Sequence, residues 1–68
     1  MTFPRDWKEF RKWREKQTFA NSELTNLAEI VENIMRVLAQ LDEVGAEMPA
    51  FRSGAEITIN EFERKLQG

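Results

Sequence analysis

The chain has 68 residues, of which 41% are hydrophobic and 32% charged, and its net charge at neutral pH is −2. This composition excludes a disordered tail, and the apolar runs are too short to span a bilayer. Cysteine, histidine and tyrosine are absent, which excludes disulfides, the usual transition-metal ligands and the commonest general base. We therefore expect one small domain over residues 1–68 that binds no metal or cofactor and is not an enzyme.

Small size predicts a need for partners. A chain of this length buries only about 60% of the surface that its unfolded form exposes, and natural domains this short use staples, metals or subunit contacts. Because disulfides and metal sites are excluded, contact with another subunit is the remaining way to stabilise such a small domain. No apolar leader segment follows Met1, so we expect a cytoplasmic protein without a membrane span.

The first predicted helix covers about residues 4–17. Pro4 suits a first helical turn, and neither glycine nor proline interrupts the residues that follow. One face of this helix is aromatic and the opposite face is basic. Tryptophan and arginine are enriched in binding hot spots, although the aromatic face also suits core packing. The predicted partner-binding residues are Trp7, Lys8, Arg11, Lys12, Trp13 and Arg14.

Charge is divided unevenly along the chain, with a net +3 in residues 1–20 and −5 in residues 21–68. Lys8, Lys12 and Lys16 follow one another at intervals of four, where like charges repel unless an anion lies opposite. The first candidate for this anion is the acidic outer face of the second predicted helix, on the same chain or a neighbouring one; the others are nucleic-acid phosphate and an anionic membrane surface. A pI near 5.1 argues against nucleic acid.

The second predicted helix covers about residues 22–44 and carries an uninterrupted heptad with Leu24 at position a. Asn21 or Ser22 can cap its start, and Gly45 supplies a left-handed cap at its end. Apolar residues at a and d are typical of a coiled-coil seam. The predicted self-association residues are Leu24, Leu27, Val31, Ile34, Leu38 and Leu41.

A third apolar column at position g, formed by Ile30, Val37 and Val44, makes this stripe broader than the seam of a simple dimeric coiled coil. At 1.5 Å per residue the helix is roughly 35 Å long, whereas a compact globule of this size is roughly 28 Å across. The helix should therefore overhang a monomeric core. We expect a second copy to cover the remainder, in a homodimer or a higher oligomer.

Residues 46–54 are predicted to form a loop. Met48 and Phe51 are poor choices for a solvated linker, so we expect them to fold back onto the bundle. Pro49 is expected to prevent any continuation of the second helix.

The third predicted helix covers about residues 55–67. Ser53 with Glu56 forms the pattern of a capping box, and Thr58 with Glu61 offers a later start. Residues 56–60 also alternate in the period of a strand, but no pairing strand is evident.

Two carboxylate pairs merit attention, Glu29 with Glu32 and Asp42 with Glu43. The heptad places Glu29 and Glu43 at f and Glu32 at b, facing solvent, and Asp42 at e, where it should be the least exposed of the four. A solvated polar face is the expected role of these residues, rather than acid–base chemistry in a dry pocket.

Together these patterns predict an all-α protein of three helices, with a long central amphipathic helix and a bundle completed by oligomerisation. The expected function is non-catalytic: a protein-interaction and oligomerisation module that acts as a small adaptor, scaffold or inhibitor of a larger protein. Its partners would be a second copy and an unidentified protein. The alternative is an accessory protein that binds nucleic acid through the basic, aromatic first helix.

Overall fold

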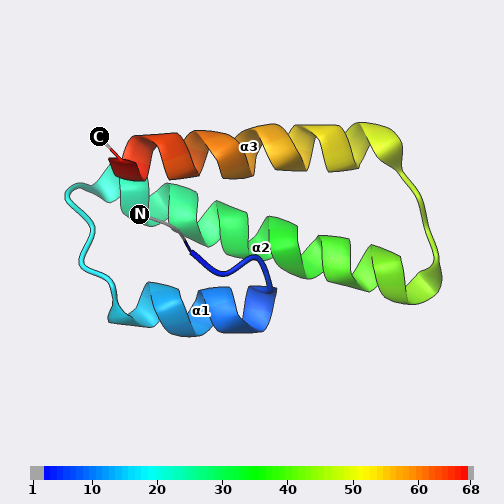
Figure 1. The fold of residues 1–68 in the computed structure, drawn as a ribbon, viewed down its shortest axis with the longest axis horizontal. Coiled ribbons are helices and arrows are strands. Elements are labelled where there is room, and N and C mark those ends of the chain that lie inside the picture. Colours follow the sequence, from blue (N-terminus) through cyan, green and yellow to red (C-terminus); the bar gives the residue numbers. More distant parts are fainter. Residues whose placement is uncertain (1–2, 68) are drawn as a thin grey trace.

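The computed structural model describes residues 3–67 and contains α1 (Trp7–Lys16), α2 (Ser22–Val44) and α3 (Pro49–Gln67). Over that range it is entirely helical, so the prediction of an all-α chain with three helices is confirmed. Both α1 and α3 run alongside α2 in the opposite direction (Figure 1). The molecule measures 37 × 21 × 18 Å. None of the helices in the described part is long and apolar enough to cross a membrane.

Helix α1 begins three residues later than predicted. The side chain of Asp6 accepts a hydrogen bond from the backbone N–H of Glu9 at 3.3 Å, which makes Asp6 the N-cap. Pro4 therefore lies before the helix rather than in its first turn. Because residues 3–6 are not helical, the chain can turn back and place Phe3 in the core, where its side chain is buried.

Helix α2 has the boundaries that the heptad predicts. The side chain of Asn21 caps its start by accepting from the N–H of Leu24 at 2.9 Å. Gly45 ends it with a φ of 71°, and the N–H groups of Gly45 and Ala46 donate to the carbonyls of Asp42 and Leu41. Only glycine adopts this left-handed conformation without a steric cost.

Helix α3 begins at Pro49, six residues earlier than predicted, so the connection to α2 is only residues 45–48. Proline fits the first turn of a helix because it has no N–H to leave unpaired. Arg52 then closes that turn, donating from its backbone N–H to the carbonyl of Met48 and from its guanidinium to the carbonyls of Glu47 and Ala46.

The early start of α3 contradicts the two capping boxes and part of the loop that the sequence predicts. Ser53 and Glu56 lie within α3, as do Thr58 and Glu61, so neither pair forms a capping box. Residues 56–60 are helical, so the predicted helix is confirmed there over the strand alternative. Met48 does not fold back onto the bundle, since 53% of its surface is exposed, whereas Phe51 is half-buried.

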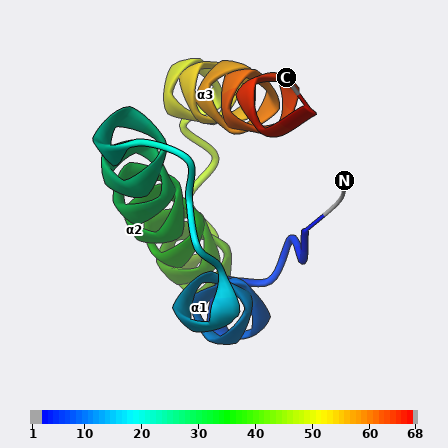
Figure 2. The same cartoon turned by 90° about the vertical axis from the view of Figure 1, so that its left-hand side faces the viewer.

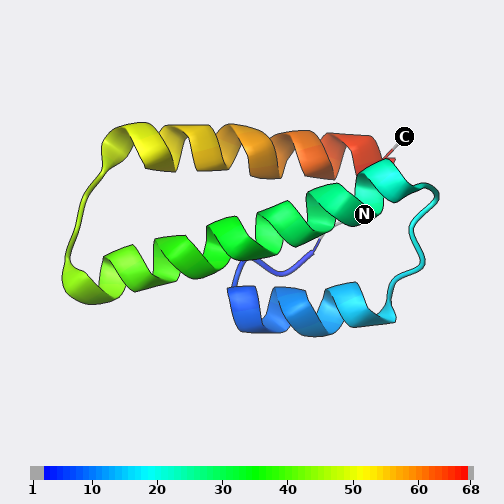
Figure 3. The same ribbon diagram turned by 180° about the vertical axis from the view of Figure 1, so that it is seen from behind.

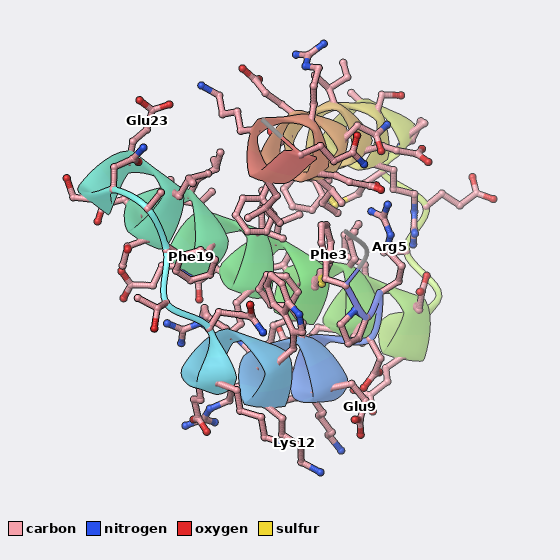
Figure 4. All side chains as sticks on the ribbon, turned by 60° about the vertical axis from the view of Figure 1, so that its left-hand side comes forward. Phe3, Arg5, Glu9, Lys12, Phe19 and Glu23 are labelled. Atoms are coloured by element: carbon pink, nitrogen blue, oxygen red, sulfur yellow. The ribbon has the colours of Figure 1, made fainter. Side chains whose placement is uncertain are left out.

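The core is built from three helices and the segment that precedes them. Helix α2 contributes the side chains at heptad positions a and e. Five phenylalanine and tryptophan rings from elsewhere in the chain pack together beside them. The N-terminal segment runs from α1 toward α3 (Figure 2), and in Figure 4 the ring of Phe3 lies between these helices, in contact with Phe10 and Phe62. The buried side chains are Phe3, Phe10, Leu24, Ala28, Val31, Met35, Ala55, Ile59 and Phe62.

This core occupies one half of the molecule. Helix α1 runs beside only part of α2 (Figure 1), and no residue between 36 and 54 is buried. The far end of the α2–α3 hairpin is thus two helices thick rather than three. The radius of gyration is 12.2 Å, compared with about 11 Å expected for a compact chain of this length.

Candidate interaction surfaces

The four carboxylates of the two sequence pairs have different surroundings. Glu29 and Glu43 are exposed on α2. The side chain of Glu32 is only 13% exposed, because α1 packs beside position b and Arg14 bonds to it at 2.9 Å. Asp42, predicted to be the least exposed of the four, has a side chain that is 66% exposed and pairs with Arg52 at 2.6 Å. The expected order of exposure is therefore wrong, and Glu32 and Asp42 pair with two different arginines.

The described residues contain no group of three acidic side chains placed to hold a metal ion. Within residues 3–67, no buried side-chain nitrogen or oxygen lacks a hydrogen-bond partner. The buried polar side chains of this part of the chain are therefore all satisfied.

The basic side of α1 carries its own counter-charges. Glu9 and Lys12 extend away from the body below α1 (Figure 4) and approach within 3.8 Å of each other. Arg11 lies 3.7 Å from Glu15 on the next turn. Lys8 extends over the ring of Trp7, with its Nζ 5.7 Å from the ring centroid. The residues predicted to form a cationic partner-binding patch thus make contacts within the chain.

The two tryptophans have different surroundings. Trp13 packs against four phenylalanine rings, with centroid distances from 5.3 to 6.3 Å; these are Phe3, Phe10, Phe19 and Phe62. Phe19 reaches this group from the loop between α1 and α2 (Figure 4). Trp7 is half-buried at the edge of the core. Its ring lines a pocket between the start of α1 and the second half of α2. The interior thus uses most of the surface of Trp13.

The predicted self-association residues fall into two groups. Leu24 and Val31, at position a, are buried in the chain's own core, with Val31 completely enclosed. The other four are half-buried: Leu27, Ile34, Leu38 and Leu41. An intermolecular seam that used position a would therefore require the monomer core to open.

Position g is instead the apolar column that faces outward. Ile30, Val37 and Val44 are 49%, 37% and 77% exposed. Arg14 of α1 reaches Glu32 at position b, and Lys65 of α3 reaches Glu23 at g near the start of α2, so the two flanking helices pack on either side. The face of α2 between them is unobstructed in Figure 3.

Neutral amides accompany this apolar column. Position c holds Asn26, Asn33 and Gln40, all of them exposed. Positions c and g alternate at intervals of four and three residues, which is the spacing of a coiled-coil seam. We call these six residues the outer stripe: Asn26, Ile30, Asn33, Val37, Gln40 and Val44. The g column is visible in the sequence, but the importance of the amides emerges only once the covered faces of α2 are known.

One end of the outer stripe opens into a groove of about 530 Å³ between α2 and α3, with Leu27 and Ile30 in its wall. The groove is crossed by Lys65, whose Nζ lies 2.6 Å from a carboxylate oxygen of Glu23. This hydrogen bond and the opposite charge lower the pKa of Glu23 and raise the pKa of Lys65. The pair ties the start of α2 to the end of α3, and Glu23 extends outward at that end in Figure 4.

Comparison with known proteins gives no relative from which a role could be transferred: no family model, no curated protein and no solved structure matches this chain.

Proposed function

We propose that this chain is a non-catalytic protein-interaction and oligomerisation module, which acts as a small adaptor, scaffold or inhibitor of a larger protein. The outer stripe carries the proposal. Three β-branched side chains recur there every seven residues on one exposed helix face, and none of the six residues is charged. Single exposed apolar side chains are ordinary, but their regular recurrence on one uncharged helix face supports a binding surface.

The surface area of the molecule supports the same proposal. The accessible surface is 4821 Å², whereas a compact monomer of this mass would expose about 4450 Å². The excess reflects a core that stops halfway along α2, combined with the uncovered outer stripe. Association through α2 would bring such a chain closer to the burial of a larger domain.

The rival proposal, nucleic-acid binding, has less support. Arg11, Arg14 and Lys12 each lie within 4 Å of a carboxylate of the same chain. A phosphate backbone would have to compete with these carboxylates. The acidic remainder of the chain would also repel it.

The test is absolute mass by light scattering behind size exclusion, over a hundredfold range of concentration and at low and high salt. We expect a mass of at least two chains at the upper concentrations. Val37→Asp should shift the population to monomers, because a buried unpaired carboxylate opposes association. Ile57→Asp is the control, since it changes another exposed β-branched residue, on α3 and 66% exposed against 37% for Val37, and it should leave the mass unchanged.

Both variants should retain the melting temperature of the monomer, since both positions are exposed. A chain that stays monomeric throughout and captures no protein would contradict the proposal. Tight, salt-sensitive binding to a duplex oligonucleotide, lost when Lys8, Lys12 and Lys16 are replaced by glutamine, would instead favour nucleic acid.

A further inference from the structure

The outward-facing columns of α2 are arranged symmetrically about one residue. Helix α2 spans Ser22–Val44, and Asn33 is its midpoint. We infer that two copies of this chain pack α2 against α2, antiparallel, with a twofold axis passing beside Asn33. This inference rests on the proposed function and specifies the partner, the surface and the register.

The register follows from the outer stripe. With the axis at Asn33, full overlap of the two helices brings Ile30 beside Val37 of the second copy, and Asn26 beside Gln40 of the second copy. Asn33 meets its own counterpart. An amide both donates and accepts hydrogen bonds, so the same side chain can pair with a copy of itself. Ile30 and Val37 thus meet each other and amides meet amides, whereas Val44 falls beside Glu23 of the second copy.

The two flanks of the stripe agree with this register. On one flank, position f places Glu29 opposite Arg36 of the second copy, and the symmetry repeats that ion pair. Glu43 falls opposite Ser22 and Glu23 in the first turn of the other α2, where free N–H groups carry partial positive charge and Lys65 pairs with Glu23. Glu29 and Arg36 form no ion pair within residues 3–67; Arg36 instead donates to the side chain of Asn33 at 3.0 Å, beside the proposed axis.

On the other flank, position d is half-buried and apolar. Antiparallel packing about Asn33 brings Leu27 beside Leu41 of the second copy, and Ile34 beside its own counterpart. A parallel arrangement would instead set the f column of each helix against the d column of the other, because opposite flanks of a seam meet in parallel pairs. Charged Glu29 and Arg36 would then face leucine and isoleucine, so the antiparallel arrangement is the one that matches charge and polarity.

Space is available for this contact. Helices α1 and α3 pack on either side of α2 and leave its outer face open along the whole helix (Figure 2, Figure 3). The overlap would cover 23 residues from each copy, or about 34 Å of helix. It would bury the g column without disturbing Val31 or the aromatic core.

Cysteine cross-linking tests the register, and the absence of natural cysteine makes the experiment clean. Asn33→Cys should form a disulfide-linked dimer on mild oxidation, since the two Cα atoms lie across the axis within cross-linking range. Asn26→Cys and Gln40→Cys should each remain unlinked alone but form a mixed disulfide when combined. A disulfide formed by Asn26→Cys alone would show a parallel pair and overturn the inference.

Charge exchange is the second test. Glu29→Arg and Arg36→Glu should each raise the dimer dissociation constant about tenfold at low salt, because each replaces two attractive contacts with two repulsive ones. The double variant, with both charges exchanged, should recover the wild-type constant. Glu56→Arg, on the exposed side of α3, is the control and should have little effect. Circular dichroism of each variant checks that the monomer fold is retained.

The two proposals fail separately. If the wild type forms dimers but the mixed disulfide does not appear and charge exchange has no effect, the register is wrong and the proposed function stands. If the wild type remains monomeric at every concentration, self-association itself is wrong.

Discussion

At the scale of single residues, Phe62 joins several separate parts of the chain. It is completely buried, and its ring lies 5.3 Å from Phe3, 6.0 Å from Phe10 and 6.2 Å from Phe19, measured between centroids. Helix α3 is therefore connected through this one side chain to the N-terminal segment, to α1 and to the loop that follows α1.

Phe62→Ala should lower the free energy of unfolding by about 3–5 kcal/mol, through lost burial and the cavity that remains. A domain of this size has a total stability of roughly 3–10 kcal/mol, so the variant should be largely unfolded or close to it. Phe51→Ala is the control, because Phe51 is only half-buried at the far end of the hairpin. Urea denaturation checks both, and equal losses would contradict a core confined to one half.

The Glu23–Lys65 pair gives the chain a specific response to acid. Because the pKa of Glu23 is lowered in the folded state, its contribution is fully present above the unfolded pKa and is lost as the pH falls through the lowered value. Glu23→Gln should therefore reduce the melting temperature slightly at pH 7 and have no effect once the wild-type carboxyl is protonated. A difference between the two proteins that persists unchanged in strong acid would show that charge is not its cause.

At the scale of elements, the two described glycines play opposite parts. Gly45 has a positive φ, so Gly45→Ala should destabilise the protein by about 1 kcal/mol. Gly54 lies inside α3, and an added Cβ there would meet nothing within 4 Å. Gly54→Ala should therefore stabilise the protein by up to about 1 kcal/mol. Thermal unfolding of the two variants should give shifts of opposite sign, and shifts of the same sign would contradict these backbone roles.

The elements also show which features the sequence predicts well. Helix α2 could be read from the chain because its heptad and both caps, Asn21 and Gly45, are local signals. The start of α3 lies earlier than the sequence predicts, because Pro49 both ends what precedes it and occupies the first turn of the next helix. Pro4 and Asp6 are both suited to a helix start. Helix α1 begins after Asp6, whose carboxylate caps it.

The candidate surface was predictable only in part. Ile30, Val37 and Val44 form an apolar column that is visible in the sequence. Positions a and d form two more, and the sequence does not show which column faces solvent. Which column faces outward depends on where α1 and α3 dock, and that is decided by non-local contacts such as Arg14 with Glu32. The same docking explains why Glu32 is nearly covered although its heptad position suggested solvent.

At the scale of the whole molecule, the chain has one thick half and one thin half, since no residue from 36 to 54 is buried. Local opening requires little free energy where few apolar contacts must be broken. The far end of the hairpin should therefore open and close many times without global unfolding. Amide hydrogen exchange should be fast near Val44 and Pro49, and slow around Val31 and Phe62. The protein would then meet its partners with one end of α2 held rigid and the other still adjusting its shape.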